Sequence, residues 1–385
     1  MIIEAILKIN PEAQVVVRGN DLATCEIEWH NCSPISKSEI EAMIPVVEAE
    51  IAQAKIDTTA KSFLTRNYRN LIINGDMSIA QRGTSFTCSN ATGSKYTLDR
   101  FQYIDVDTPD SVYTITSSTD VPTGQGFAKS LKVDVATADA SLDANDGTQI
   151  QQSIEAQNLQ YLKFGTSSAE SLTLSFWVKS NKTGTYVVRL LQPDSSSRMV
   201  SFAYTISSSS TWEKKTISIP ADTSGNINND NGSGLNITWW LSAGSSYTSG
   251  SLASTWQAYS NGDSAVGQVN LADSTSNEFY LTGVQLEAGT TASDFEFLPY
   301  DVNLQRCLRY YLPLFDGSPG RYIANAFYYA NTHLKIHVEA PVNMRATPSI
   351  EQTVASNCWT MYSNSSGQSF SNSLIMDGGN ANKIF

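Results

Sequence analysis

Aromatic, amide and carboxylate side chains lie close together in one loop-like stretch of the sequence, from Trp256 to Asp263. Sugar rings stack on aromatic side chains, while their hydroxyl groups bind nearby amides and carboxylates. The stretch therefore predicts a glycan-binding loop with contacts from Trp256, Tyr259, Asn261 and Asp263. The alternative is that Trp256 packs this loop onto the protein body, which is the more common role of such a residue.

Two further aromatic residues, Trp239 and Trp240, are adjacent in a stretch with strand character. Neighbouring side chains of a strand point to opposite faces. One ring therefore belongs to the core, and the other is either exposed or covered by a neighbouring element. We include Trp240 among the candidate ligand contacts.

Catalytic motifs are absent from the sequence, which contains neither GxSxG nor HExxH and only three histidines. His333 and His337 share one face of a predicted strand, where they bind a metal ion or simply lie at a surface. A pair of carboxylates can cleave glycans without further groups, but no such pair stands out. The sequence predicts a protein that is not an enzyme.

The composition narrows the possible partners. The formal net charge is −12 and no run of lysine and arginine occurs, so nucleic-acid binding is not expected. No apolar run approaches the roughly 18 residues of a membrane span, so no membrane insertion is expected. Five scattered cysteines form no CxxC pair and predict buried thiols rather than a disulfide framework.

The N-terminal region, residues 1–65, predicts a hairpin followed by a helix. Two strand-like runs, 14–18 and 25–29, flank a Gly-Asn-Asp turn, and Ser36 or Ser38 then caps a helix. That helix carries a seam of apolar residues at heptad spacing: Ile40, Ile44, Val47 and Ile51. The seam predicts either a short coiled coil that joins three chains or an amphipathic helix packed on its own hairpin. Pro45 favours the second alternative.

The main region, residues 70–300, contains eight or more strand-like runs separated by loops rich in Ser, Gly, Asn and Asp. Several alternate between apolar and polar residues, as in LTLSFWV at 172–178, which is typical of antiparallel sheets. We predict a mainly β protein, an antiparallel β-sandwich of the jelly-roll kind. Residues 301–385, with a short helix and further strands, predict a small C-terminal β module.

Three groups of segments resemble the recurrent modules of phage tail-fibre and minor structural proteins. They are NLIINGDMSIAQRGT (70–84) with YTLDRF (96–101), FYLTGVQLEAG (279–289) with FEFLPY (295–300), and QRCLRYY (305–311) with PVNMRATP (341–348). The first two groups also resemble the opening and closing strands of carbohydrate-binding-module jelly rolls. In such jelly rolls, the positions of Asp76 and Glu287 hold a structural ion, so the resemblance implies a Ca²⁺ site there.

The resemblance implies a subunit of a phage tail fibre, located in the virion and assembled in the host cytoplasm. Residues 1–65 would attach it to tail or adaptor proteins as a homotrimer, and the remainder would contact a host-surface glycan or receptor. Two alternatives stay open. One is a structural or decoration protein of the capsid or tail, and the other is a tailspike that depolymerises glycans.

Overall fold

The computed structural model describes residues 2–30, 32–64, 68–314, 326–330, 333–336, 338–350, 359–363, 366–370 and 383–384. The chain divides into two compact units, residues 1–67 and 68–385. Each unit is described by itself. Among the described helices, none combines the length and the apolar composition that a membrane crossing requires.

The first unit contains two helices and a hairpin. Helix α1 (Ile2–Ile9) precedes strands β1 (Gln14–Arg18) and β2 (Glu26–His30), which pair antiparallel as predicted, and α2 (Lys37–Leu64) follows. Helix α2 begins with the expected cap: the Ser36 hydroxyl donates to the Glu39 carboxylate at 2.6 Å, and the Glu39 N–H donates to the Ser36 hydroxyl at 3.3 Å.

Most residues of the predicted heptad seam pack inside this unit. Ile40 and Val47 are buried in a cluster with α1 and the hairpin, and Ile44 is partly buried against the same cluster. Ile51 is 37% exposed. For Ile40 and Val47 the structure therefore matches the packing alternative, with α1, which the sequence pattern did not reveal, covering them beside the hairpin.

Replacing Ile40 with alanine is expected to lower the stability of this unit by about 3 kcal/mol, since the change leaves a cavity among buried aliphatic side chains. Hydrogen exchange of residues 2–30, measured in the full chain, should accelerate accordingly. The Ile51→Ala variant is the matched control and should exchange as the unchanged protein does. A drop in molar mass of Ile40→Ala, with unaltered exchange, would instead assign Ile40 to contacts between chains.

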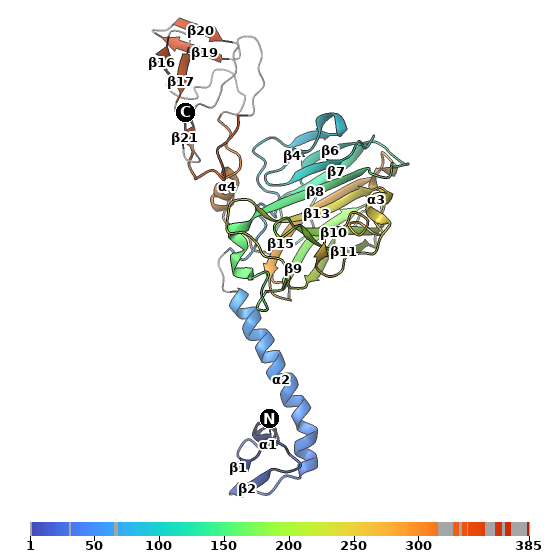
Figure 1. The fold of residues 1–385 in the computed structure, drawn as a ribbon, viewed down its shortest axis with the longest axis vertical. Helices are drawn as coiled ribbons and strands as arrows, with labels where there is room; N and C mark the ends of the chain where they lie inside the picture. The colour runs from blue at the N-terminus through green and yellow to red at the C-terminus, as the bar shows by residue number, and fades with distance from the viewer. Residues whose placement is uncertain are drawn as a thin grey trace. The chain divides into compact units, whose positions relative to one another are not determined.

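The second unit is built on two antiparallel sheets (Figure 1). One sheet has six strands, in the order β12 (Glu213–Ile219), β9 (Leu172–Ser180), β15 (Glu278–Ala288), β7 (Ser130–Thr137), β6 (Val112–Ser118) and β3 (Ser85–Cys88). The other has seven, in the order β14 (Gln257–Ala258), β11 (Arg198–Ile206), β10 (Gly184–Gln192), β13 (Ser233–Ala243), β8 (Gly147–Glu155), β5 (Gln102–Val106) and β4 (Lys95–Tyr96).

Rings from the two sheets meet in the core between them. Phe176 of β9 packs edge-on against Trp239 of β13, with ring centroids 5.9 Å apart, and Tyr186 of β10 lies 5.7 Å from Phe279 of β15. The alternation at 172–178 places Leu172, Leu174, Phe176 and Val178 in this core. The predicted fold class, a mainly β protein with an antiparallel sandwich, is confirmed.

Short helical turns lie in the connections of the sandwich: η1 (Asn90–Thr92), η2 (Ala156–Leu162), α3 (Ser245–Thr248) and η3 (Leu271–Asp273). Helix α3 decides the position of the two adjacent tryptophans. Trp239 faces the core, and Trp240 on the opposite face is covered by Tyr247 of α3, with ring centroids 5.2 Å apart. Both rings are fully buried, so the outward-facing Trp240 is covered by a neighbouring element and is not exposed.

The described part of the C-terminal region begins with α4 (Tyr300–Leu308), which is held on the sandwich. Arg309 donates to both carboxylate oxygens of Glu155 at the end of β8, each at 2.7 Å. Strand pairs β16 (Ala326–Ala330) with β17 (His333–Ile336), β18 (Val338–Glu339) with β21 (Lys383–Ile384), and β19 (Trp359–Ser363) with β20 (Ser366–Phe370) follow. A separate module from residue 301 stays a prediction, and His337 lies outside the described residues.

Candidate functional site

A hollow lies on the outer face of the six-stranded sheet, the face turned away from the core. Its volume is about 310 Å³, at the lower end of the range of small-molecule pockets. We call it the aromatic pocket, and it is lined by Gly124, Gln125, Phe127, Ser175, Trp177, Lys214, Gly283, Asp294, Phe295 and Phe297. Three neighbouring strands, β9, β15 and β12, and two loop segments therefore build it.

Strand alternation places the floor of the pocket. Trp177 stands between the buried Phe176 and Val178 on β9, so its indole faces outward. It pairs across the sheet with Thr282 of β15 on one side and with Lys214 of β12 on the other. The indole is half-buried, which leaves part of its ring open to the pocket.

Gly283 allows the rings to approach the sheet. It lies in an irregularity of the β9–β15 pairing and has a φ of +61°, a conformation that favours glycine. A Cβ atom at this position would lie 2.6 Å from Cζ of Phe127 and 3.0 Å from Cδ1 of Trp177. A larger residue would therefore displace the rings or fill the pocket.

Three phenylalanines form one wall. Phe127, Phe295 and Phe297 contact one another with ring centroids 4.8 to 5.2 Å apart. Phe127 is buried, whereas Phe297 is 50% exposed. A contiguous group of apolar rings that is partly exposed beside a hollow is typical of a binding site, whereas single exposed rings are common on protein surfaces. The wall and Trp177 together offer flat apolar surfaces to a ligand.

Polar groups complete the lining. Lys214, Asp294 and Gln125 are exposed at the rim, and Ser175 is buried beside Trp177. No ion pair joins the Lys214 ammonium or the Asp294 carboxylate to another described residue, so both can bind a ligand. Flat rings surrounded by hydrogen-bonding groups match a sugar, which has apolar C–H faces and a rim of hydroxyls.

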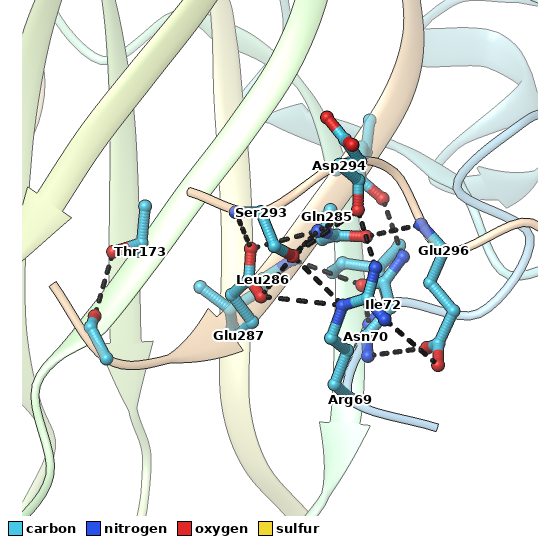
Figure 2. A network of polar contacts seen from close by, with 12 residues as sticks. Arg69, Asn70, Ile72, Thr173, Gln285, Leu286, Glu287, Ser293, Asp294 and Glu296 are labelled. Atoms are coloured by element: carbon cyan, nitrogen blue, oxygen red, sulfur yellow. Dashed lines mark hydrogen bonds and ion pairs between the residues drawn. The ribbon is translucent and has the colours of Figure 1, made fainter. Parts of the chain in front are cut away.

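A polar network anchors the wall segment 293–297 to strand β15 (Figure 2). Glu287 accepts hydrogen bonds from the Ser293 N–H at 2.9 Å and the Ser293 hydroxyl at 2.7 Å. Gln285 donates to Glu287 at 2.9 Å and accepts from the Glu296 N–H at 2.8 Å. Because Gln285 and Glu287 flank the buried Leu286, both project onto the outer face of the sheet.

The first residues of the sandwich unit join the same network. Arg69 donates to the Ser293 hydroxyl at 2.9 Å and to the Asp294 carbonyl at 2.6 Å. Its Nε lies 3.7 Å from the Glu287 carboxylate. The Asn70 N–H donates to Glu296 at 2.9 Å. The opening and closing segments of the sandwich thus hold Phe295 and Phe297 in place.

For Trp256, the structure supports the second of the two alternatives that the sequence offered, packing of the loop onto the protein body. The Trp256 Nε1 donates to the Pro220 carbonyl at 2.8 Å, and its ring packs edge-on against Phe164 at 5.7 Å, so the packing alternative describes this side chain. Asp263 accepts from the Ser251 N–H and from Gln257. Tyr259 and Asn261 are exposed. Trp240 is fully buried, which corrects its assignment as a ligand contact at the surface.

Asp76 and Glu287, the predicted calcium ligands, bind protein donors. Asp76 accepts from Ser78 at 3.1 Å and from Asn303 at 3.2 Å, while the Glu287 carboxylate accepts the bonds described above. Within the described residues, no group of three or more His, Cys, Asp or Glu side chains is placed to hold a metal ion. Each of the two carboxylates thus binds its own set of protein donors.

Trp177 and Phe297 were not among the residues selected from sequence. The signal for Trp177 was present, since an aromatic residue between two core positions of an alternating strand must face outward. Phe127 and Phe297 carried no comparable signal, because they come from loops whose position depends on β15 and on residues 69–70.

Comparisons with known proteins give distant likeness only. No family model and no curated protein matches the chain. Among solved structures, the enzymatically active domain of tailspike protein 4 from bacteriophage CBA120 is 14% identical (TM-score 0.30), covering 57% of this chain and 22% of the tailspike. The family 11 carbohydrate-binding module of a Clostridium thermocellum cellulosomal cellulase is 13% identical (TM-score 0.27, coverage 52% and 97%). TmCBM61 in complex with β-1,4-galactotriose is 10% identical (TM-score 0.27, coverage 57% and 99%).

Proposed function

We propose that this protein binds a host-surface glycan through the aromatic pocket, as a non-enzymatic subunit of a phage tail fibre. The observation that carries the proposal is the pocket of about 310 Å³, in which Trp177 and the half-exposed Phe297 face a rim of Lys214 and Asp294. One or two sugar units fill a space of this size, with C–H faces on the rings and hydroxyls on the rim.

The segments that resemble tail-fibre modules support the proposal by their place in the pocket. Residues 279–289 form β15 and supply Gly283, and residues 295–300 supply the wall with Phe295 and Phe297. The start of the opening segment, residues 70–75, lies beside β15, where the Leu71 N–H donates to the Leu286 carbonyl at 2.9 Å. The resemblance and the pocket therefore coincide in the same part of the sandwich.

Residues 1–65 would attach the protein to the virion tail or an adaptor protein, and the fibre would be a homotrimer. A shallow pocket binds a sugar weakly, and three copies acting together raise the overall affinity without any new contact. The net charge of −12 is compatible with this role, because it keeps a densely assembled particle soluble and does not repel neutral glycans.

Glycan binding by the Trp177→Ala and Phe297→Ala variants tests the pocket. Each substitution removes a stacking surface and is expected to weaken binding about tenfold, which corresponds to about 1.4 kcal/mol. A glycan array identifies the ligand, and titration calorimetry gives its dissociation constant. Tyr96→Ala is the matched control, because Tyr96 is a similarly exposed ring (38%) on the seven-stranded sheet, outside the pocket lining.

Unchanged affinity in both pocket variants would overturn the proposal. Release of reducing ends from the bound glycan would assign the protein to the depolymerising tailspikes instead. Normal adsorption by particles carrying both pocket substitutions, together with a defect in particle assembly, would assign it to the structural proteins of the capsid or tail.

A further inference from the structure

Arg189 is a buried cation on the outer face of the seven-stranded sheet. It lies on β10 between Ser201 of β11 and Thr238 of β13, both fully buried, and it is itself only 6% exposed. Arginine is rarely buried to this degree unless a carboxylate accompanies it. Its surroundings therefore need an explanation.

Among the described residues, the groups that bind or pack against Arg189 are neutral: Ser264, Trp240 and Tyr259, of which Tyr259 is also a hydrogen-bond partner. Nη1 donates to the Ser264 hydroxyl at 3.4 Å, a long hydrogen bond, and Nε has no acceptor. The guanidinium carbon lies 5.3 Å from the ring centre of Trp240 and 5.7 Å from that of Tyr259. Asp263, in the loop that covers this face, gives its carboxylate to Ser251 and Gln257.

Two other arginines of the sandwich have carboxylate partners, whereas Arg100 is as buried as Arg189 and its Nε likewise has no acceptor among the described residues. Arg198, on the adjacent strand β11, donates to both oxygens of Asp222, at 2.8 and 3.0 Å. Arg309 makes the equivalent pair with Glu155. Among the described residues, no carboxylate lies within ion-pair distance of Arg189. Burial also lowers the pKa of Arg189, although its guanidinium stays protonated at neutral pH.

A second donor without an acceptor lies beside it. The Nε1 of Trp240 is buried and makes no hydrogen bond to any described residue, and the Trp240 ring is the one that Arg189 packs against. This part of the sheet therefore holds two N–H groups that lack acceptors and one positive charge that lacks a negative one. A compact anion with several oxygen atoms would supply all of these.

We propose that Arg189 is an anion-binding site, which takes a ligand carrying a carboxylate or a similar compact oxyanion, such as an acidic sugar unit. Tyr259 is the outer boundary of the site: its ring is 41% exposed and its centre lies 5.7 Å from the guanidinium carbon, so we expect the anion to enter past this side chain. The site is on the opposite sheet from the aromatic pocket and does not depend on it. Because the protein carries a net charge of −12, general attraction cannot account for anion binding here.

Thermal unfolding and calorimetry of the full chain with sodium glucuronate and with sodium sulfate test the site. Either anion is expected to raise the melting temperature of the unchanged protein, and Arg189→Met should weaken its binding at least about tenfold. Without ligand, Arg189→Met should melt at the same temperature or higher, because it removes an unpaired buried charge. Binding of glucuronate alone identifies an acidic sugar as the ligand, while binding of both identifies a site for any compact oxyanion.

Arg198→Met is the matched control. This substitution leaves the buried Asp222 carboxylate without its partner, so the variant should melt at a lower temperature and still bind the anion. Arg189→Lys, which keeps the charge without the planar fork, should bind more weakly than the unchanged protein. The proposal is overturned if neither anion binds, if Arg189→Met binds as the unchanged protein does, or if Arg189→Met is destabilised as strongly as Arg198→Met.

Discussion

Replacing Glu287 with alanine is expected to lower the free energy of unfolding by about 3 kcal/mol. The Glu287 side chain is only 4% exposed, and it accepts hydrogen bonds from Ser293 and Gln285 beside the Arg69 guanidinium (Figure 2). Its loss leaves three donors without this acceptor and removes one of the two carboxylates beside Arg69. Removing one partner of such a group costs more than the pair contributes, because the other partner cannot regain water.

The same variant should bind the glycan about fivefold more weakly, which corresponds to about 1 kcal/mol. Glu287 does not line the aromatic pocket, but it holds Ser293, and thereby the segment that carries Phe295 and Phe297. Without Glu287, the wall must become ordered when the glycan binds. The entropy lost in that ordering weakens the binding. Glu287 is thus a positioning residue for the proposed site.

Urea unfolding and calorimetry measure the two effects of Glu287→Ala. The control is Asp110→Ala, which makes the same change of charge at an exposed loop position of the same sandwich. It should leave the unfolding free energy within about 0.5 kcal/mol of the original. If Glu287→Ala loses stability but keeps full affinity, the network stabilises the sandwich without positioning the wall.

Replacing Glu155 with glutamine is expected to cost about 3 kcal/mol at neutral pH. Glu155 is almost fully buried and accepts two hydrogen bonds from Arg309, one from Gln157 at 2.6 Å and one from the Tyr310 hydroxyl. The Tyr310 ring in turn packs against the Arg100 guanidinium, whose carbon lies 3.4 Å from the ring centre. This cluster fastens the end of α4 to the sandwich.

The effect of Glu155 should depend on pH in a defined direction. Burial raises its pKa, but the hydrogen bonds from Arg309 and Tyr310 and the charge of Arg309 outweigh burial, so its pKa lies below the usual 4.5. A carboxyl whose pKa is depressed in the folded state stabilises the fold above its unfolded pKa. That contribution disappears as pH falls through the folded value. The stability difference between the unchanged protein and Glu155→Gln should therefore shrink as pH falls below 4.5.

A double substitution measures the interaction energy between Glu155 and Arg309 apart from their contacts with other residues. Glu155→Gln with Arg309→Met should cost less than the sum of the two single variants, by at least about 1 kcal/mol. Glu170→Gln, which breaks the more exposed pair with Lys163 at 3.2 Å, serves as the control and should cost no more than about 1 kcal/mol. Additive costs would show that Glu155 and Arg309 do not act as a unit.

Local patterns in the sequence determined much of the fold. Alternation along β9 and β13 identified the strands and their core faces, since side chains of a strand point to opposite sides with a period of two. The hairpin and the Ser36 cap could also be predicted, because both depend on residues close together in the chain. The same alternation already implied that Trp177 faces outward.

Only the tertiary structure decided what covers each outward face. Trp177 and Trp240 both lie on outer faces of strands. Trp177 remains half-exposed beside Phe127 and Phe297, whereas Trp240 is buried beneath Tyr247 of α3. Helix α1 likewise covers Ile40 and Val47, for which the heptad pattern had left open contacts with neighbouring chains or packing on the hairpin. In the same way, Arg198 binds Asp222, whereas Arg189 has no carboxylate partner in the part of the chain that the structure describes. These outcomes depend on loops that return from distant parts of the chain, and a pattern of period two carries no information about where such loops lie.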